Sequence, residues 1–371
     1  AISKALLSED VLCVAQTGSG KTMCFLLPLL ERLSASTSSP NIGLILAPTR
    51  ELVMQHAGIA EELAAALPNS PEVKVISKGT TSPMTSVASR AAGTSPVLLV
   101  AQPDDALARL RDGTLDASSL LAVALDEVDA ILCGGPFEET ISPEGAELLD
   151  AMGLVGTDTL NGAAGKDSNA VPASPQCLLT TAHLTQAHDA ALRATFPAAA
   201  RVQQRAASGR TAGALVPSLR QIFHYTASHN KDAKLVSVLA RAQNDPWLSG
   251  GAALIFTSSA ASVERLSAVV SQSRPQARFA PLVLHEELDD CTRADAFSAL
   301  RAAARESSDG APMEPRILIA TGVAARGLDV ANLRHVVLYD MPEDVAGYIH
   351  CAGRTARRGR NGLVSCLVES Q

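Results

Sequence analysis

Residues 11–22 read VLCVAQTGSGKT, and the class of fold can be inferred from them. Val11–Ala15 is a short apolar run typical of a buried strand, and a segment with helical spacing begins at Thr22. Between them, Gly18 and Gly20 let the backbone curl so that successive N–H groups face an anion, and the helix N-terminus adds partial positive charge. The stretch therefore predicts a phosphate-binding loop between a strand and a helix of an α/β fold.

The residue types in this loop suit a nucleoside triphosphate. Lys21 would reach the β- and γ-phosphates, and the Thr22 hydroxyl would bind Mg²⁺. Ala15 replaces the first glycine of the pattern G-x-x-x-x-G-K-[ST] and is small enough for the same turn. The simpler alternative is a glycine-rich turn with an exposed lysine, and the flanking strand and helix argue against it. The predicted cofactor contacts in the loop are Ala15, Gln16, Thr17, Gly18, Ser19, Gly20, Lys21 and Thr22.

A second buried run, Leu121–Leu125, ends in two carboxylates, Asp126 and Glu127. The carboxyl end of a central strand is where α/β sheets bind ligands. We expect Asp126 to hold Mg²⁺ and Glu127 to orient and deprotonate the attacking water. A solvated acidic loop is the alternative, and the phosphate loop upstream makes it the weaker one.

Apolar runs along the rest of the chain indicate two series of strands with helices between them. Runs that are apolar throughout are typical of parallel strands covered on both faces. The expected helices include Thr22–Arg32, Glu51–Ala66 and Ser262–Gln272. The expected strands are Val11–Ala15, Gly43–Ala47, Val97–Val100, Leu121–Leu125 and Cys177–Thr180, then Ala252–Phe256, Pro281–Leu284, Arg316–Ala320, His335–Tyr339 and Leu363–Val368.

The length of 371 residues and the two strand series indicate two domains. We place the first domain at 1–205, a Gly/Ala/Ser-rich linker at 206–215 and the second domain at 216–371. Polar stretches at 153–175 and 306–315 are predicted surface insertions.

Composition excludes several classes of function. Aromatic residues make up 3%, too few for a binder that grips bases mainly by stacking, and the net charge of −7 excludes bulk cationic binding of nucleic acid. No apolar run approaches the roughly 20 residues of a membrane helix. The seven cysteines lie singly and indicate reduced thiols inside a cell. Because the first residue is Ala, a targeting segment could precede it, so nucleus, cytoplasm and organelle all stay open.

Several motifs in one order resemble the DEAD-box ATP-dependent RNA helicases of helicase superfamily 2, with DEVD as the acidic motif. The resemblance covers nearly the whole chain apart from the two insertions. Its residues are Ala15–Thr22, Pro48–Leu52, Asp126–Asp129, Thr181–His183, Ile255–Thr257, Ala320–Asp329 and Tyr348–Arg357.

This resemblance implies two tandem RecA-like domains, each a parallel β-sheet flanked by helices, with ATP and RNA bound across the cleft between them. The implied activity is ATP hydrolysis coupled to local duplex unwinding or RNP remodelling by a monomer. Arg354 and Arg357 would stabilise charge on the γ-phosphate, and Asp329 would contact the ribose. Asp129, Thr181, His183 and His350 would couple the nucleotide to the RNA. The RNA contacts would be Pro48, Thr49, Arg50, Gly79, Arg293, Thr321 and Arg326, on the backbone and largely independent of base sequence.

The chain also departs from the family pattern. Gln102–Asp105 stands where the family has Thr-Pro-Gly-Arg, Gly322 replaces an Asp and Cys351 replaces an Arg. The glutamine motif that selects adenine would lie before Ala1. These departures leave two alternatives open: an ATP-dependent RNA clamp with little unwinding activity, and a DNA-directed motor or other phosphate-loop NTPase.

Overall fold

The chain divides into two compact units, Ala1–Gly213 and Ala214–Gln371. The structure is a computed structural model. It describes residues 1–15, 19–36, 41–77, 96–133, 140–154, 174–182, 184–203, 218–243, 245, 248, 251–273, 280–289, 292–293, 295–296, 299, 317–322, 333–343, 345–357 and 360–369. The expected linker at 206–215 and nearly all of both expected insertions lie outside these residues.

Seven parallel strands form the sheet of the first unit, in the order β3-β4-β2-β5-β6-β1-β7. The strands are β1 (Val11–Val14), β2 (Ile42–Leu46), β3 (Glu72–Ile76), β4 (Val97–Ala101), β5 (Leu120–Asp126), β6 (Gln176–Thr181) and β7 (Ala200–Gln203). The helices are α1 (Ile2–Leu6), α2 (Lys21–Ala35), α3 (Arg50–Ala64), α4 (Pro103–Arg111), α5 (Val128–Leu132), α6 (Pro143–Ala151) and α8 (Gln186–Thr195), and a 3₁₀ turn, η2 (Ala117–Ser119), precedes β5.

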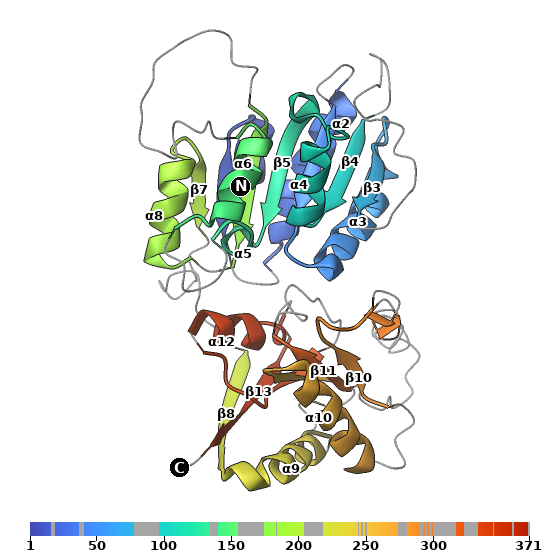
Figure 1. Ribbon diagram of the computed structural model, residues 1–371, viewed down its shortest axis with the longest axis vertical. Coiled ribbons are helices and arrows are strands. Elements are labelled where there is room, and N and C mark those ends of the chain that lie inside the picture. Colours follow the sequence, from blue (N-terminus) through green and yellow to red (C-terminus); the bar gives the residue numbers. More distant parts are fainter. Residues whose placement is uncertain are drawn as a thin grey trace. The chain divides into compact units, whose positions relative to one another are not determined.

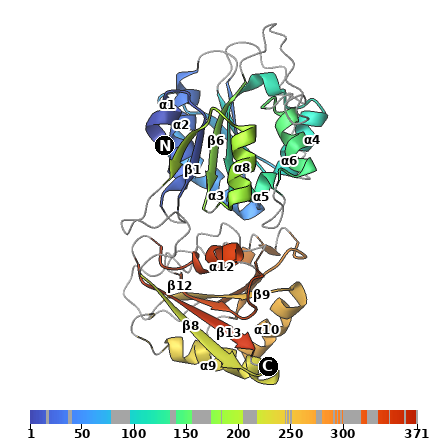
Figure 2. The same ribbon diagram turned by 90° about the vertical axis from the view of Figure 1, so that its left-hand side faces the viewer.

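Helices cover both faces of this sheet, and alternation along the strands explains why. Leu44 and Leu46 of β2 pack in one hydrophobic cluster with α4, α5 and α6, whereas Ile45 packs in the other with α1, α2 and α3. Figure 1 shows α4 and α6 on one face, and Figure 2 shows α1 and α2 on the opposite side from them. Because both faces are buried, every residue of β2 and β4 is apolar or glycine.

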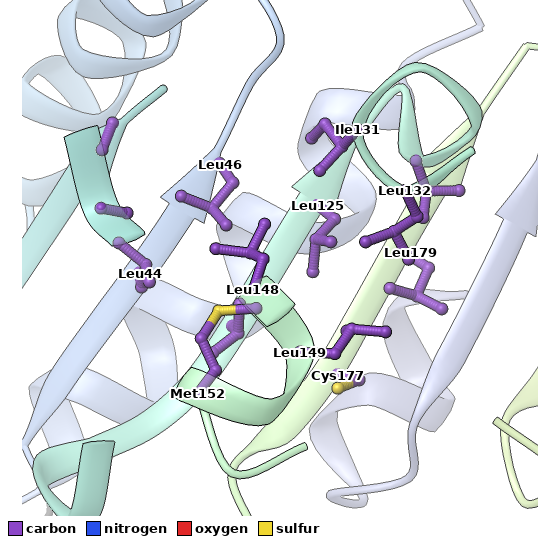
Figure 3. Packing of buried hydrophobic residues seen from close by; sticks show 14 of the residues in the cluster. Leu44, Leu46, Leu125, Ile131, Leu132, Leu148, Leu149, Met152, Cys177 and Leu179 are labelled. Carbon is purple, nitrogen blue, oxygen red and sulfur yellow. The ribbon is translucent and has the colours of Figure 1, made fainter. Parts of the chain in front are cut away.

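The cluster around α6 shows how tightly these layers pack. In Figure 3, Leu148 of α6 and Met152, which directly follows this helix, lie against Leu44 and Leu125 of the sheet. A Cβ added at Gly145 of α6 would stand 2.4 Å from the carbonyl oxygen of Leu132, so only glycine allows α6 to approach α5 this closely.

Six parallel strands form the sheet of the second unit, in the order β10-β11-β9-β12-β13-β8. One face is covered by α9 and α10 and the other by α12, as Figure 1 also shows. The strands are β8 (Leu219–Thr226), β9 (Ala252–Thr257), β10 (Leu282–Leu284), β11 (Ile317–Thr321), β12 (Leu333–Leu338) and β13 (Gly362–Glu369); the helices are η3 (Ser228–Asn230), α9 (Lys231–Gln243), α10 (Ala260–Ser273) and α12 (Val345–Ala352).

The expected α/β class with parallel sheets is confirmed. All ten expected strands are present, with ends that differ by at most two residues, and the three expected helices are α2, α3 and α10. Three strands were not expected: β3, β7 and β8. In β3 polar residues alternate with apolar ones, and β8 also contains both kinds, because each strand lies at a sheet edge and is partly exposed.

Candidate active site

The predicted site residues of the first unit lie at the carboxyl ends of three neighbouring strands. In the sheet, β6 lies between β1 and β5. Val14 of β1 is in register with Thr181 of β6, and Thr180 of β6 is in register with Asp126 of β5. The amide of Ala15 then donates to the carbonyl of Thr181 at 3.2 Å. The fold thus brings the phosphate loop and the acidic motif to one edge, although they are more than a hundred residues apart.

The described ends of the phosphate loop have the conformation that the sequence predicts. Gly20 has φ of 91° and precedes α2, a left-handed conformation that favours glycine. Lys21 begins α2, and its Nζ donates to the carbonyl of Ala15 at 2.8 Å, which joins the two ends of the loop. Ser19 is exposed and Thr22 is half-buried. Gln16, Thr17 and Gly18 lie outside the described residues.

Asp126 is buried and receives three hydrogen bonds. His56 Nε2 contacts Oδ2 at 2.9 Å, while the Thr180 hydroxyl donates to Oδ1 at 2.6 Å and the Glu127 amide at 3.1 Å. Burial alone would raise the pKa of this carboxyl, but the bond to His56, with Thr180 and the charge of Lys21, lowers it to about 2. The structure therefore holds a fixed anion beside the phosphate loop.

Glu127 adopts a strained backbone conformation. Its φ is 55° and ψ is 54°, in the left-handed region, and it is the N-cap residue of α5. Such a conformation costs about 1–3 kcal/mol for a residue with a side chain and is found most often at functional sites. Glu127 is 8% exposed, so a second buried acidic residue directly follows Asp126.

Asp129 and Thr181, both predicted coupling residues, contact each other. The Thr181 hydroxyl donates to Asp129 Oδ1 at 2.6 Å, joining β6 to the first turn of α5. His183, the third residue of the Thr181–His183 motif, lies outside the described residues. One end of the DEVD motif is therefore bound to β6 through Thr180 and the other through Thr181.

Three predicted RNA contacts, Pro48, Thr49 and Arg50, follow β2, and the end of the neighbouring strand β4 lies beside them. Thr49 accepts a hydrogen bond from the Leu52 amide and so caps α3, which begins at Arg50. Gln102, after β4, donates from Nε2 to the carbonyl of Pro48 at 3.4 Å. Gly79 lies outside the described residues. The geometry thus gathers Pro48, Thr49 and Arg50 with the divergent segment Gln102–Asp105.

Asp104 and Asp105 have a structural role that the sequence reasoning missed. Both lie in the first turn of α4, where carboxylates stabilise the partial positive charge of a helix N-terminus. Asp105 is 8% exposed, so only Asp104 offers an exposed carboxylate on this edge.

In the second unit, a missed acidic residue accompanies two predicted RNA contacts. The Thr321 hydroxyl, at the end of β11, donates to Glu286 Oε2 at 2.7 Å. Burial would raise the pKa of Glu286, but Thr321 and the charges of His285 and Arg293 lower it. Thr321 and Arg293 therefore share Glu286 as a neighbour. Arg326 and Asp329 lie outside the described residues.

The two predicted γ-phosphate arginines follow α12, and each side chain donates a hydrogen bond to a backbone carbonyl four residues earlier in the chain. Arg354 Nε donates to the carbonyl of His350, and Arg357 Nε donates to that of Gly353, each at 2.9 Å. Arg354 is 2% exposed and Arg357 is half-buried, whereas Arg360 is exposed. The first two arginines are thus built into the fold, unlike an exposed basic tail.

A Mg²⁺ ion fits the donors of the first unit only together with a phosphate. Within the described ranges, no group of three or more His, Cys, Asp or Glu side chains could hold a metal ion. Mg²⁺ prefers oxygen ligands and commonly binds through one or two carboxylates plus substrate phosphates. The ionised Asp126 and the Thr22 hydroxyl are oxygen donors of that kind.

The sequence patterns did not identify His56, Thr180 or Glu286 as site residues. Only His56 lies in a pattern that could have indicated its role. His56 lies on the buried face of α3 together with Leu52, Val53, Ala57 and Ala60. A histidine in the apolar stripe of a helix suggests a buried polar partner. Thr180 and Glu286 had no comparable signal.

Comparison with known proteins agrees with this geometry. Residues 1–189 match the DEAD/DEAH box helicase family, and residues 231–359 match the helicase conserved C-terminal domain. The chain is 29% identical over 368 residues to the ATP-dependent rRNA helicase rrp3 of Aspergillus niger and 30% identical to RRP3 of Ajellomyces capsulatus. Each alignment covers 99% of this chain, but only 67% and 65% of the relative. In Pyricularia oryzae RRP3 the share falls to 59%.

Two solved structures share the fold. Dbp5 of S. cerevisiae, bound to RNA and ADP BeF3, has a TM-score of 0.72 and 20% identity, with 98% of this chain and 80% of that chain covered. The DEAD-box helicase Mss116, bound to ssRNA and UDP-BeF, has a TM-score of 0.74 and 20% identity, with 100% and 69% covered. The expected tandem RecA-like architecture is confirmed by these matches. No helix in the described part of the chain has the length and apolar character needed to cross a membrane. With one family match over residues 1–189 and the second over most of the other unit, the chain belongs to the DEAD/DEAH box helicase family.

Proposed function

We propose that this protein is an ATP-dependent RNA helicase that couples ATP binding and hydrolysis to RNA binding and local duplex unwinding or RNP remodelling. One observation carries the proposal. The phosphate loop and the Asp126-Glu127 pair lie at the ends of three neighbouring strands, in a chain whose relatives are named ATP-dependent rRNA helicases.

In this proposal the first unit binds and activates the nucleotide. Lys21 binds the β- and γ-phosphates, and Thr22 with Asp126 would hold Mg²⁺, which neutralises phosphate charge when bound. Glu127 orients the attacking water and accepts its proton. Arg354 and Arg357 supply positive charge to the phosphate being transferred, and Asp329 contacts the ribose.

RNA is the proposed partner, held by its sugar–phosphate backbone. The shared edge of β2 and β4 offers Arg50 and the N-terminus of α3, which attract a phosphate. Thr321 and Arg293 would bind backbone in the second unit, where Glu286 holds the Thr321 hydroxyl. Such contacts predict little dependence on base sequence. The fungal relatives are named rRNA helicases, and an rRNA substrate would place this protein inside the cell.

ATP hydrolysis with and without single-stranded RNA tests the proposal. We expect RNA to increase the rate at least several-fold, and Glu127→Gln to abolish turnover while ATP still binds, because a positioned general base contributes about 10²–10⁴-fold. A rate indifferent to RNA, or unchanged in Glu127→Gln, would refute it. Stronger stimulation by DNA than by RNA would support the DNA-directed motor instead.

A strand-displacement assay separates the helicase from the clamp alternative. The helicase releases a short RNA strand from a duplex in the presence of ATP, and release stops in Glu127→Gln under multiple turnover. A clamp binds RNA more tightly with ATP but releases no strand. The names of the relatives favour the helicase.

A further inference from the structure

His56 is a buried polar side chain for which the nucleotide chemistry described above has no use. It lies in the second turn of α3 and is 0% exposed. Its Nδ1 has no hydrogen-bond partner among the residues that the structure describes. Leaving a buried polar atom without a hydrogen bond destabilises the folded state, and an aliphatic side chain at this position would avoid that cost. The single hydrogen bond from its other nitrogen therefore needs a reason.

That hydrogen bond goes to the carboxylate of Asp126. His56 Nε2 lies 2.9 Å from Oδ2, on the opposite oxygen from the Thr180 and Glu127 donors. Because an ionised carboxylate only accepts, Nε2 carries the proton and donates. Each carboxylate oxygen thus has at least one donor inside the protein, and the group has little freedom to rotate.

The imidazole ring is itself held in place. Phe25 of α2 packs against it edge to face, with ring centroids 5.4 Å apart and planes at 87°. Phe25 lies one helical turn after Thr22, the other predicted metal ligand. A chain of contacts therefore runs from Phe25 of α2 through His56 to Asp126.

We infer that His56 is a positioning residue which, with Thr180, holds Asp126 in the orientation that receives the Mg²⁺ of a bound nucleotide. The inference rests on the proposed function of this site. Outer-shell partners of metal-binding carboxylates orient them, and their loss typically costs about 10–100-fold in metal affinity or activity. His56 acts through Asp126 and touches neither nucleotide nor metal.

Equilibrium binding of ATP as a function of Mg²⁺ concentration tests this inference without measuring turnover. In His56→Leu, we expect the Mg²⁺ concentration for half-maximal tightening of ATP binding to rise about 10–100-fold. ATP binding in EDTA should stay as in the wild type, because the phosphate loop is intact. His56→Gln, which restores a donor, should recover most of the loss.

Two further variants complete the test. His188→Leu removes another buried histidine of the same unit, on α8, and should leave the Mg²⁺ requirement unchanged. Thr180→Val removes the donor on Oδ1 and should raise the requirement, so it decides the matter if His56→Leu does not fold. An unchanged Mg²⁺ requirement in the folded variants, or an equal loss with and without Mg²⁺, overturns the inference. A wild type that shows no Mg²⁺-dependent ATP binding refutes the proposed function itself.

Discussion

The Thr181 hydroxyl lies 2.6 Å from Asp129 Oδ1 and donates a hydrogen bond to it. The preceding residue, Thr180, bonds Asp126 in the same way. Two consecutive residues of β6 therefore hold both ends of the DEVD motif, although successive side chains of a strand point to opposite faces. This is possible because the motif turns sharply at Glu127, whose left-handed conformation brings Asp129 onto the other side.

We predict that loss of the Thr181–Asp129 hydrogen bond weakens the stimulation of ATP hydrolysis by RNA but leaves ATP binding nearly unchanged. Thr181→Val keeps the shape of the side chain but removes the donor. We expect ATP affinity to change by less than about threefold. RNA stimulation of hydrolysis should fall about 10–150-fold, because loss of a hydrogen bond to a charged group costs about 1.5–3 kcal/mol. Steady-state hydrolysis with and without RNA measures both. Thr181→Ser, which keeps a hydroxyl, should behave as wild type, and equal stimulation in both variants would exclude a coupling role.

His335 of β12 predicts a pH-dependent stability. Its Nε2 contacts the Ser365 hydroxyl oxygen at 2.9 Å, and burial together with His224 lowers its pKa to about 4, against a small opposite effect of Asp245. An unfolded histidine has a pKa of about 6.5. Between these values the unfolded chain binds more protons, so the free energy of unfolding is highest above pH 6.5 and falls as the pH falls toward 4.

Urea unfolding at pH 7 and pH 5 measures this effect. The wild type should lose about 2 kcal/mol from this group between the two pH values. His335→Gln, which can keep the bond to Ser365 but does not titrate, should lose less over the same interval. Parallel losses in the two proteins would show that His335 does not titrate with the lowered pKa.

Cys24 is predicted to be the reactive thiol beside the phosphate loop. It is half-exposed on α2, whereas the other described cysteines are buried. A hydrogen bond from the Cys13 thiol lowers its pKa most, burial opposes this, and the charge of Lys21 adds to the lowering, so that the pKa is about 6. At pH 7 most of the group is thiolate, the form that attacks alkylating agents.

Alkylation by iodoacetamide, followed by peptide mass spectrometry, checks this prediction. The rate at Cys24 should be half-maximal near pH 6, and ATP should slow it because Lys21 lies one turn away. In Cys13→Ala the midpoint should move up toward the ordinary thiol value of about 8.5. A wild-type midpoint already at that value would contradict the proposed thiol pair.

Sequence patterns predicted the strands of this fold where both faces are buried. β2 and β5 have no polar residue before their ends, so their apolar runs stand out. The same patterns missed β8, whose residues alternate between half-buried and exposed at the edge of its sheet. An edge strand lacks the continuous apolar run, and only its pairing with β13 reveals it.

The sequence predicts the reactive groups of the candidate site but not the residues that hold those groups in place. Asp126 ends a buried strand, Glu127 follows it, and Lys21 ends the loop after another buried strand, so local sequence places all three at one edge of a parallel sheet. His56 and Thr180 reach Asp126 from α3 and β6, and no local pattern predicts which strand becomes the neighbour of β5. Likewise, no local pattern predicts that Asp105, in the divergent segment Gln102–Asp105, is buried in the first turn of α4.

The proposed function requires that the guanidinium groups of Arg354 and Arg357, in the second unit, act on the nucleotide bound by Lys21. ATP turnover at saturating RNA, measured together with ATP affinity in Arg354→Lys, Arg357→Gln and Arg360→Gln, tests it most directly. We predict that turnover falls about 10³-fold or more in the first two while ATP still binds, because such arginines contribute about 10³–10⁵-fold in phosphate-loop NTPases. The exposed Arg360 serves as the control and should stay near wild type. RNA-stimulated turnover that survives in both Arg354→Lys and Arg357→Gln would contradict the account.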